Sequence, residues 1–172
     1  MFAGMVHWHD KGAPDWYAIG RTIRRKYDRD REERVILDAK IDWYWRVQDW
    51  ELTTDAFLRK WEKYGIDVSN PMAAGAINNT IIKIFFQHVA DSSTLLKAAR
   101  WQKVVVDALP EDPNPLDTYA NLLYKAGRLQ EAIVLEKNAL NLAEVKAKKA
   151  NRRVDPLFQQ TIDRMSAGQP TW

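Results

Sequence analysis

The sequence predicts an all-α protein in which antiparallel helical hairpins stack as a short solenoid of about seven or eight helices. Apolar residues recur at helical spacing along most of the chain, as in Trp16, Ile19, Ile23 and Tyr27. Strictly alternating β-branched runs are absent, and the one dense run, at 104–106, lies inside a helical pattern. The apolar pattern at 95–106 also returns 34 positions later.

Caps and breaks place the elements in order along the chain. Residues 1–14 have no apolar period and are expected to form an arm, and 167–172 a mobile tail. Between them, 15–166 is predicted to be one helical domain. The helices expected there span 15–27, 31–48, a segment capped by Thr53 or Thr54 and ended by Gly65, 72–89, 93–108, 115–125, 129–149 and a last helix from Asp155.

The clearest unit is the helical hairpin 115–144, in which Gly127 suits the left-handed residue that ends the first helix. The hairpin 72–108 is predicted to be its diverged copy. Five pairs of positions separated by 34 residues support this: Leu95 and Leu129, Ala98 and Ala132, Trp101 and Leu135, Val105 and Ala139, and Val106 and Leu140. These hairpins resemble tetratricopeptide (TPR) repeats, which bury their apolar faces by stacking on neighbours.

Longer stretches resemble the helical C-terminal region of bacterial thioredoxin-family proteins of the cell envelope. The stretches are VILDAKIDWYW at 35–45, WEKYGID at 61–67, AINNTIIKIFFQHVADSSTLLKAARWQKVVV at 76–106, LDTYANLLYKAGRLQEAIVLEKNAL at 116–140 and GQPTW at 168–172. The resemblance implies an accessory helical region of a thioredoxin-like protein and a cell-envelope location. It transfers no redox residue, because the chain has no cysteine.

Composition excludes several classes of function. A net charge of +3 is too small to indicate nucleic-acid binding, and no apolar run is long enough to span a membrane. Residues 1–10 lack the basic start and apolar centre of a signal peptide, so the compartment stays open. Without cysteine, disulfides, thiol catalysis and cysteine-ligated zinc are excluded. No catalytic constellation is found, and no cofactor or metal is expected.

The favoured hypothesis is therefore a non-enzymatic domain that binds a protein or peptide. In stacked repeats the first helix of each pair lines the inner surface. The repeat register places five candidate residues there: Lys83, Gln87, Asp117, Asn121 and Tyr124. Asp117 stands where repeat domains that clamp a C-terminal carboxylate need a lysine, so that clamp is not predicted. Neither the partner nor the oligomeric state follows from the sequence.

Other clusters have ordinary structural explanations, which we favour. Glycan binding or hydrolysis by aromatic rings beside carboxylates is the main alternative function, and it would use Trp43, Trp45, Trp50 and Trp61. The segment His7 to Asp10 holds metal-ligand types but is short. His88 is expected to be a buried imidazole. The basic runs at 21–26 and 146–153 are expected to be solvated helix faces.

Overall fold

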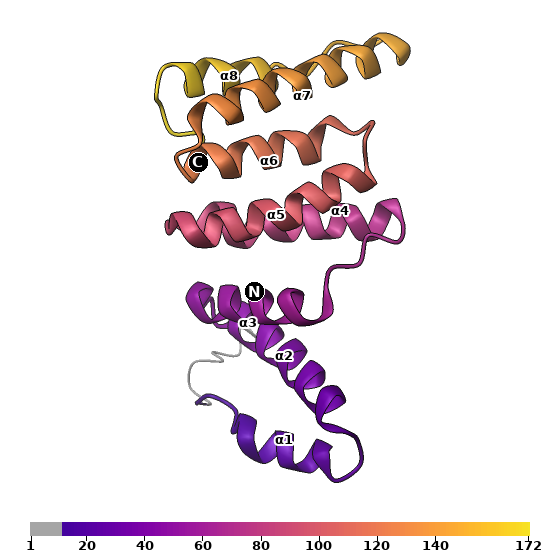
Figure 1. Ribbon diagram of the computed structural model, residues 1–172, viewed down its shortest axis with the longest axis vertical. Helices are drawn as coiled ribbons and strands as arrows, with labels where there is room; N and C mark the ends of the chain where they lie inside the picture. The colour runs from indigo at the N-terminus through magenta and orange to yellow at the C-terminus, as the bar shows by residue number, and fades with distance from the viewer. Residues whose placement is uncertain (1–11) are drawn as a thin grey trace, which may run out of the picture. The chain divides into compact units, whose positions relative to one another are not determined.

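The computed structural model describes residues 12–172, and within this range every regular element is a helix (Figure 1). The all-α prediction is confirmed for these residues. The sequence predicts a single domain over 15–166, whereas the described chain groups into two compact units, residues 12–65 and 66–172, and the boundary along the chain is the non-helical connector after Gly65. The cluster from His7 to Asp10 and most of the predicted arm lie outside the described residues.

The first unit holds α1 (Trp16–Arg24), α2 (Arg29–Arg46) and α3 (Trp50–Tyr64). Each helix begins after an aspartate whose carboxylate accepts a hydrogen bond from a backbone N–H of the first turn. The predicted caps of α3 are wrong: Asp49 caps it, accepting from Leu52 N at 3.0 Å. Thr53 and Thr54 lie one turn further on, and their hydroxyls donate to the carbonyls of Asp49 and Trp50.

Ion pairs and hydrogen bonds join the helices of the first unit. The Arg24 guanidinium binds both carboxylate oxygens of buried Glu32, joining α1 to α2. Gly20 leaves room for that carboxylate, because a Cβ there would lie 2.6 Å from Glu32 Oε1. Lys63 of α3 pairs with Asp30 at 3.0 Å and with Glu33 at 2.7 Å on α2. Such exposed ion pairs add little to stability, so the contacts of Lys63 mainly fix the register of α2 against α3.

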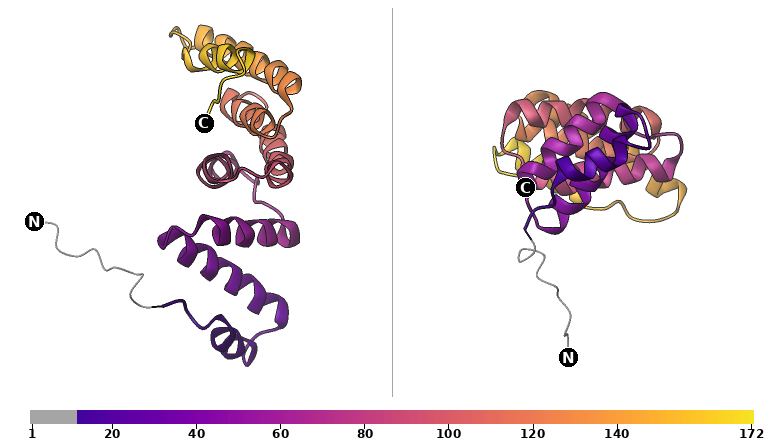
Figure 2. Two further views of the ribbon diagram at one scale, coloured as in Figure 1. Left: turned by 90° about the vertical axis from the view of Figure 1, so that its left-hand side faces the viewer. Right: turned by 90° about the horizontal axis from the view of Figure 1, so that it is seen from below.

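The second unit holds α4 (Pro71–Thr80), a π-helical turn η2 (Ile81–Phe86), α5 (Ser92–Ala108), α6 (Pro113–Lys125), α7 (Leu129–Lys149) and α8 (Leu157–Ser166). Each helix packs on the next, and η2 also contacts α6. Figures 1 and 2 show α7 and α8 side by side, with the end of the chain returning toward α6. The last helix, α8, packs against α7.

The 34-residue repeat coincides with burial. Ala98 and Ala132 are both fully buried, and so are Val105 and Ala139. The one clear mismatch is the first pair, because Leu95 is fully buried and Leu129 is 38% exposed. Helix starts also bond to the ends of the following helices at this separation: Ser92 Oγ donates to the Ala126 carbonyl at 2.9 Å. The hairpins 72–108 and 115–144 therefore share one interior.

A buried amide joins three helices of this interior. Gln102 of α5 is fully buried, and its Nε2 donates to Asn78 Oδ1 of α4 at 2.7 Å and to the Pro115 carbonyl of α6 at 2.8 Å. Asn78 has a structural role here, as an acceptor for the Gln102 side chain. The amide group fixes how the first hairpin sits on the second, because any slip would leave its donors unpaired.

Candidate functional site

The five predicted inner-surface residues separate into two groups. Lys83 and Gln87, in and just after η2, are exposed, and Tyr124 at the end of α6 is half-buried. Asp117 is half-buried and Asn121 is 8% exposed, because both turn toward the α6–α7 interface. Asn121 Nδ2 donates to Asp117 Oδ1 at 3.0 Å and to the Asp117 carbonyl at 2.9 Å.

The reason for this turn is Glu136 of α7, a fully buried carboxyl that lies against Asp117. Burial, and then the nearby Asp117 charge, raise the pKa of Glu136 to about 9. Burial also raises the pKa of Asp117 to about 6, although its contacts with Glu136 and Asn121 oppose that rise. At neutral pH Glu136 is therefore the protonated member of the pair, and its two buried oxygens have no hydrogen-bond partner among the described residues.

This carboxyl pair is a structural contact between α6 and α7. Acid–base catalysis needs a carboxyl that a substrate can reach, and Glu136 has no exposed surface. Sequence reasoning missed the pair, although the repeat contained its signal. Glu136 lies 34 positions after Gln102, and both are buried polar residues at the same place in successive hairpins.

A second group of contacts gathers around Tyr124, where the segment 169–172 lies against η2 and α6. Tyr124 donates its hydroxyl to the Gln169 carbonyl at 2.9 Å. The Trp172 ring packs edge-on against Phe86 at a centroid distance of 6.5 Å and against Tyr124 at 6.0 Å. The sequence predicts a mobile tail here; the structure instead gives these residues specific partners.

Lys125 completes this surface. Its Nζ donates to the Phe86 carbonyl at 2.6 Å, and this carbonyl belongs to the last turn of the π-helical segment. The same ammonium lies 5.5 Å from the Phe86 ring centroid and 5.2 Å from that of Trp172. Burial lowers the pKa of Lys125. We call Phe86, Tyr124 and Lys125 the tail-binding face; sequence reasoning found only Tyr124 of the three.

The segment is held by a few modest interactions. One hydrogen bond contributes about 1 kcal/mol and each aromatic pair about 0.5–1.5 kcal/mol, against the entropy of ordering four residues. Trp172 remains 56% exposed. The Thr171 hydroxyl is covered without a hydrogen-bond partner among the described residues. Residues 169–172 therefore have a defined position but are held weakly enough to dissociate from the tail-binding face.

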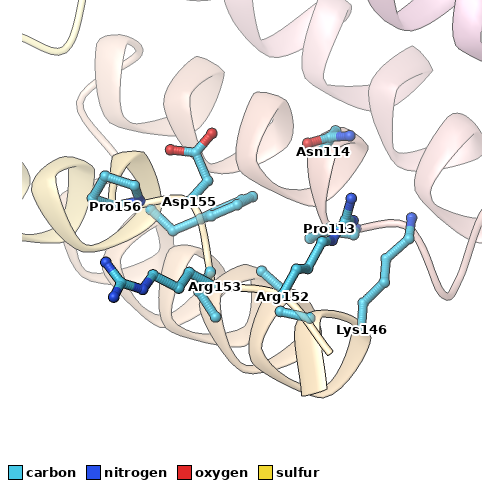
Figure 3. Close-up of a pocket in the computed structure, with 11 residues that line it drawn as sticks. Pro113, Asn114, Lys146, Arg152, Arg153, Asp155 and Pro156 are labelled. Carbon is cyan, nitrogen blue, oxygen red and sulfur yellow. The ribbon is translucent and has the colours of Figure 1, made fainter. Parts of the chain in front are cut away.

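A basic cleft lies at the other end of α7, with a volume of about 500 Å³ (Figure 3). Lys146 and Arg152 extend toward Asn114, and Arg153 lies beside Pro156. Asn151, at φ 50°, turns the chain out of α7 and presents the two arginines. Asp112 approaches Lys146 at 3.4 Å and also caps α6. The cleft resembles a solvated basic face, as expected for 146–153.

The tryptophans of the first unit are packing groups in large part. Trp61 is only 3% exposed and lies 5.2 Å from Phe57, whereas Trp43, Trp45 and Trp50 are half-buried. Trp45 and Trp50 pack edge-to-face at 5.9 Å. Stacking a sugar requires an open ring face, and edge-to-face packing restricts it. The geometry therefore favours the structural explanation for this cluster.

The remaining candidates are settled by exposure. His88 was expected to be buried and is exposed; burial of part of the ring, and then the Lys125 charge, lower its pKa. Arg24 in the basic run 21–26 is paired with Glu32. Within residues 12–172 no group of His, Asp and Glu is arranged to hold a metal ion, and no helix is both long and apolar enough to cross a membrane.

Comparison with known proteins gives no relative: the chain matches no family model, no curated protein and no solved structure.

Proposed function

We propose that the second unit is a TPR-like protein-binding module, with the tail-binding face as its contact surface for an extended polypeptide. The observation that carries this proposal is the segment 169–172 on that face. Tyr124 contacts a backbone carbonyl, which every peptide offers, and the Trp172 ring meets Phe86 and Lys125. A surface that holds its own chain in this way has the chemistry to hold another.

The helical arrangement supports the TPR-like interpretation. Successive helices of the second unit pack as neighbours, and four of the five pairs of positions 34 residues apart have matching burial. Ser92 bonds to Ala126 and Lys146 pairs with Asp112, both at a separation of 34 residues. Each of these contacts joins the start of one helix to the end of the next, as antiparallel stacking requires.

Lys83 and Gln87 extend the proposed surface. Both are exposed on the π-helical segment or just after it, beside Phe86. Their amide and ammonium groups offer hydrogen bonds to an extended segment that passes the tail-binding face. Asp117 and Asn121 are hydrogen-bonded to each other and Asp117 lies against Glu136, so they belong to the α6–α7 contact and are not part of the proposed surface.

Peptide display tests this proposal. The target is the full chain carrying Trp172→Ala, which removes the ring that occupies the face. Selected peptides should compete with one another and lose at least tenfold in affinity when Phe86→Ala is added. Lys148→Ala, an exposed change elsewhere on α7, is the matched control and should leave binding intact. Failure to enrich any peptide, or indifference to Phe86→Ala, would contradict the proposal.

The alternative of glycan binding uses the half-buried rings Trp43, Trp45 and Trp50. Titration with oligosaccharides, followed by intrinsic fluorescence, separates the two functions, since a sugar stacked on a ring quenches its emission. The wider assignment to the helical region of a thioredoxin-like protein of the cell envelope is also a proposal. It rests on the matching stretches at 35–45, 76–106 and 116–140.

A further inference from the structure

The tail-binding face contacts both the backbone and one side chain of the segment on it. These contacts define the kind of peptide that would fit the face. Tyr124 donates to the carbonyl of Gln169, and the aromatic ring that packs on Phe86 belongs to Trp172, three residues later. The hydrogen bond is independent of sequence. The ring contacts favour an aromatic side chain, because the Lys125 ammonium lies over the Trp172 ring and the Phe86 and Tyr124 rings pack against it.

We infer that the partner is an extended peptide with a large aromatic residue three positions after a hydrogen-bonded carbonyl, and that residues 169–172 occupy its place as an internal ligand. This inference rests on the proposed function and deepens it. The chain reaches the face through a turn: Gly168, at φ 68°, follows α8, and Gln169 N donates to the Arg164 carbonyl at 2.9 Å. Pro170 then restricts the segment that crosses to Trp172.

An internal ligand competes at its effective concentration, which is in the millimolar range for a short tether. If the segment itself has an intrinsic dissociation constant of about 0.1 mM for the face, any partner peptide would therefore bind the occupied face roughly tenfold more weakly than a vacant one. Partner binding and tail release are thus the same event. Nothing else in the face needs to move, because Lys125 is already held by the Phe86 carbonyl.

The test uses the full chain and the acetylated, amidated peptide Ser-Ala-Gly-Gln-Pro-Thr-Trp, residues 166–172. Calorimetric titration compares the wild-type chain with Trp172→Ala. We expect saturable binding to Trp172→Ala and at least tenfold weaker binding to wild type. Trp172→Ala with Phe86→Ala should lose the interaction, and Trp172→Ala with Lys148→Ala should keep it. A peptide with alanine in place of its tryptophan should not bind.

Equal affinity for wild type and Trp172→Ala would overturn the inference, because the face would then not be occupied. Binding that survives Phe86→Ala would overturn it as well. If this peptide fails while peptides selected by display bind the same face, the inference is wrong and the proposed function stands. A wild-type dimer that Trp172→Ala converts to monomer would assign the segment to a second copy and contradict the internal arrangement. Circular dichroism confirms that each variant is folded.

Discussion

The buried carboxyl of Glu136 on α7 lies against Asp117 of α6, and Asn121 Nδ2 donates to Asp117 Oδ1 at 3.0 Å. The contact links pH to the stability of the second unit. The pKa of Glu136 rises from 4.5 to about 9 on folding, so the folded chain holds a proton that the unfolded chain releases. The contribution of Glu136 to the free energy of unfolding is therefore greatest below pH 4.5 and falls as the pH rises toward 9. The raised pKa of Asp117 acts in the same direction at lower pH, up to about 6.

Glu136→Gln should remove most of this dependence. Glutamine has nearly the same shape and never ionises, so the variant avoids the cost of keeping a buried carboxyl protonated and should be more stable at pH 7 by about 1–3 kcal/mol. Urea unfolding at several pH values between 5 and 9 measures the effect. The control is Glu144→Gln, at an exposed position on the same helix. A wild-type stability that rises over this range, or a variant with the same slope, would show that the pKa of Glu136 is not raised in the folded chain.

Gln102→Leu should destabilise the second unit. The substitution conserves approximate volume but leaves the Pro115 carbonyl and Asn78 without their donor, at a cost of about 1–3 kcal/mol. Chemical denaturation measures the change. Gln130→Leu, at an exposed position of α7, should be close to neutral. Equal denaturation midpoints for the two variants would count against the amide bridge.

Much of this architecture follows from sequence because it depends on local periodicity. The helices from 92 to 149 and their 34-residue register need only apolar spacing and Gly127 to be predicted. The cap of α3 was missed because Thr53 and Thr54 are typical capping residues, while the competing Asp49 precedes them by one turn. The π-helical turn at 81–86 has the same apolar pattern as an α-helix, so periodicity does not reveal it.

The site depends on long-range contacts, which the sequence hardly encodes. The sequence predicts Asp117 on the inner surface, because the repeat register indicates the face of the helix but does not reveal the contact of Asp117 with Glu136 on α7. Phe86 and Trp172 are far apart in the chain, and no pattern in the sequence around either residue predicts the contact between their rings. His88 lies on the apolar side of its helical pattern but at the helix end, where the neighbouring helix no longer covers it.

Asp49→Ala should weaken the first unit. It removes the acceptor of the Leu52 N–H at the start of α3, which typically costs about 1 kcal/mol. Asp55→Ala is the matched control, because its pairing with Arg59 lies in solvent and contributes about 0.3–0.5 kcal/mol. Thermal unfolding followed by circular dichroism compares the two. If Asp55→Ala is the more damaging change, Asp49 is not the cap of this helix.

A 166–172 peptide with valine at the position of Thr171 should bind the tail-binding face more tightly than the natural peptide. The hydroxyl is covered without a partner, so removing it avoids a desolvation cost and should tighten binding roughly three- to tenfold. The measurement is calorimetry of the 166–172 peptide with valine at this position against the Trp172→Ala chain. Serine at the same position keeps the hydroxyl and provides the control. Weaker binding of the valine peptide would mean that the hydroxyl has a partner in solution.

The most direct test of the tail-binding face is an amide NMR map of the Trp172→Ala chain during titration with the 166–172 peptide. We predict that the largest shifts fall at Phe86, Gln87, Tyr124 and Lys125, and that α7 near Lys148 stays unchanged. Shifts gathered at the basic cleft around Arg152, or spread evenly over the second unit, would contradict the account.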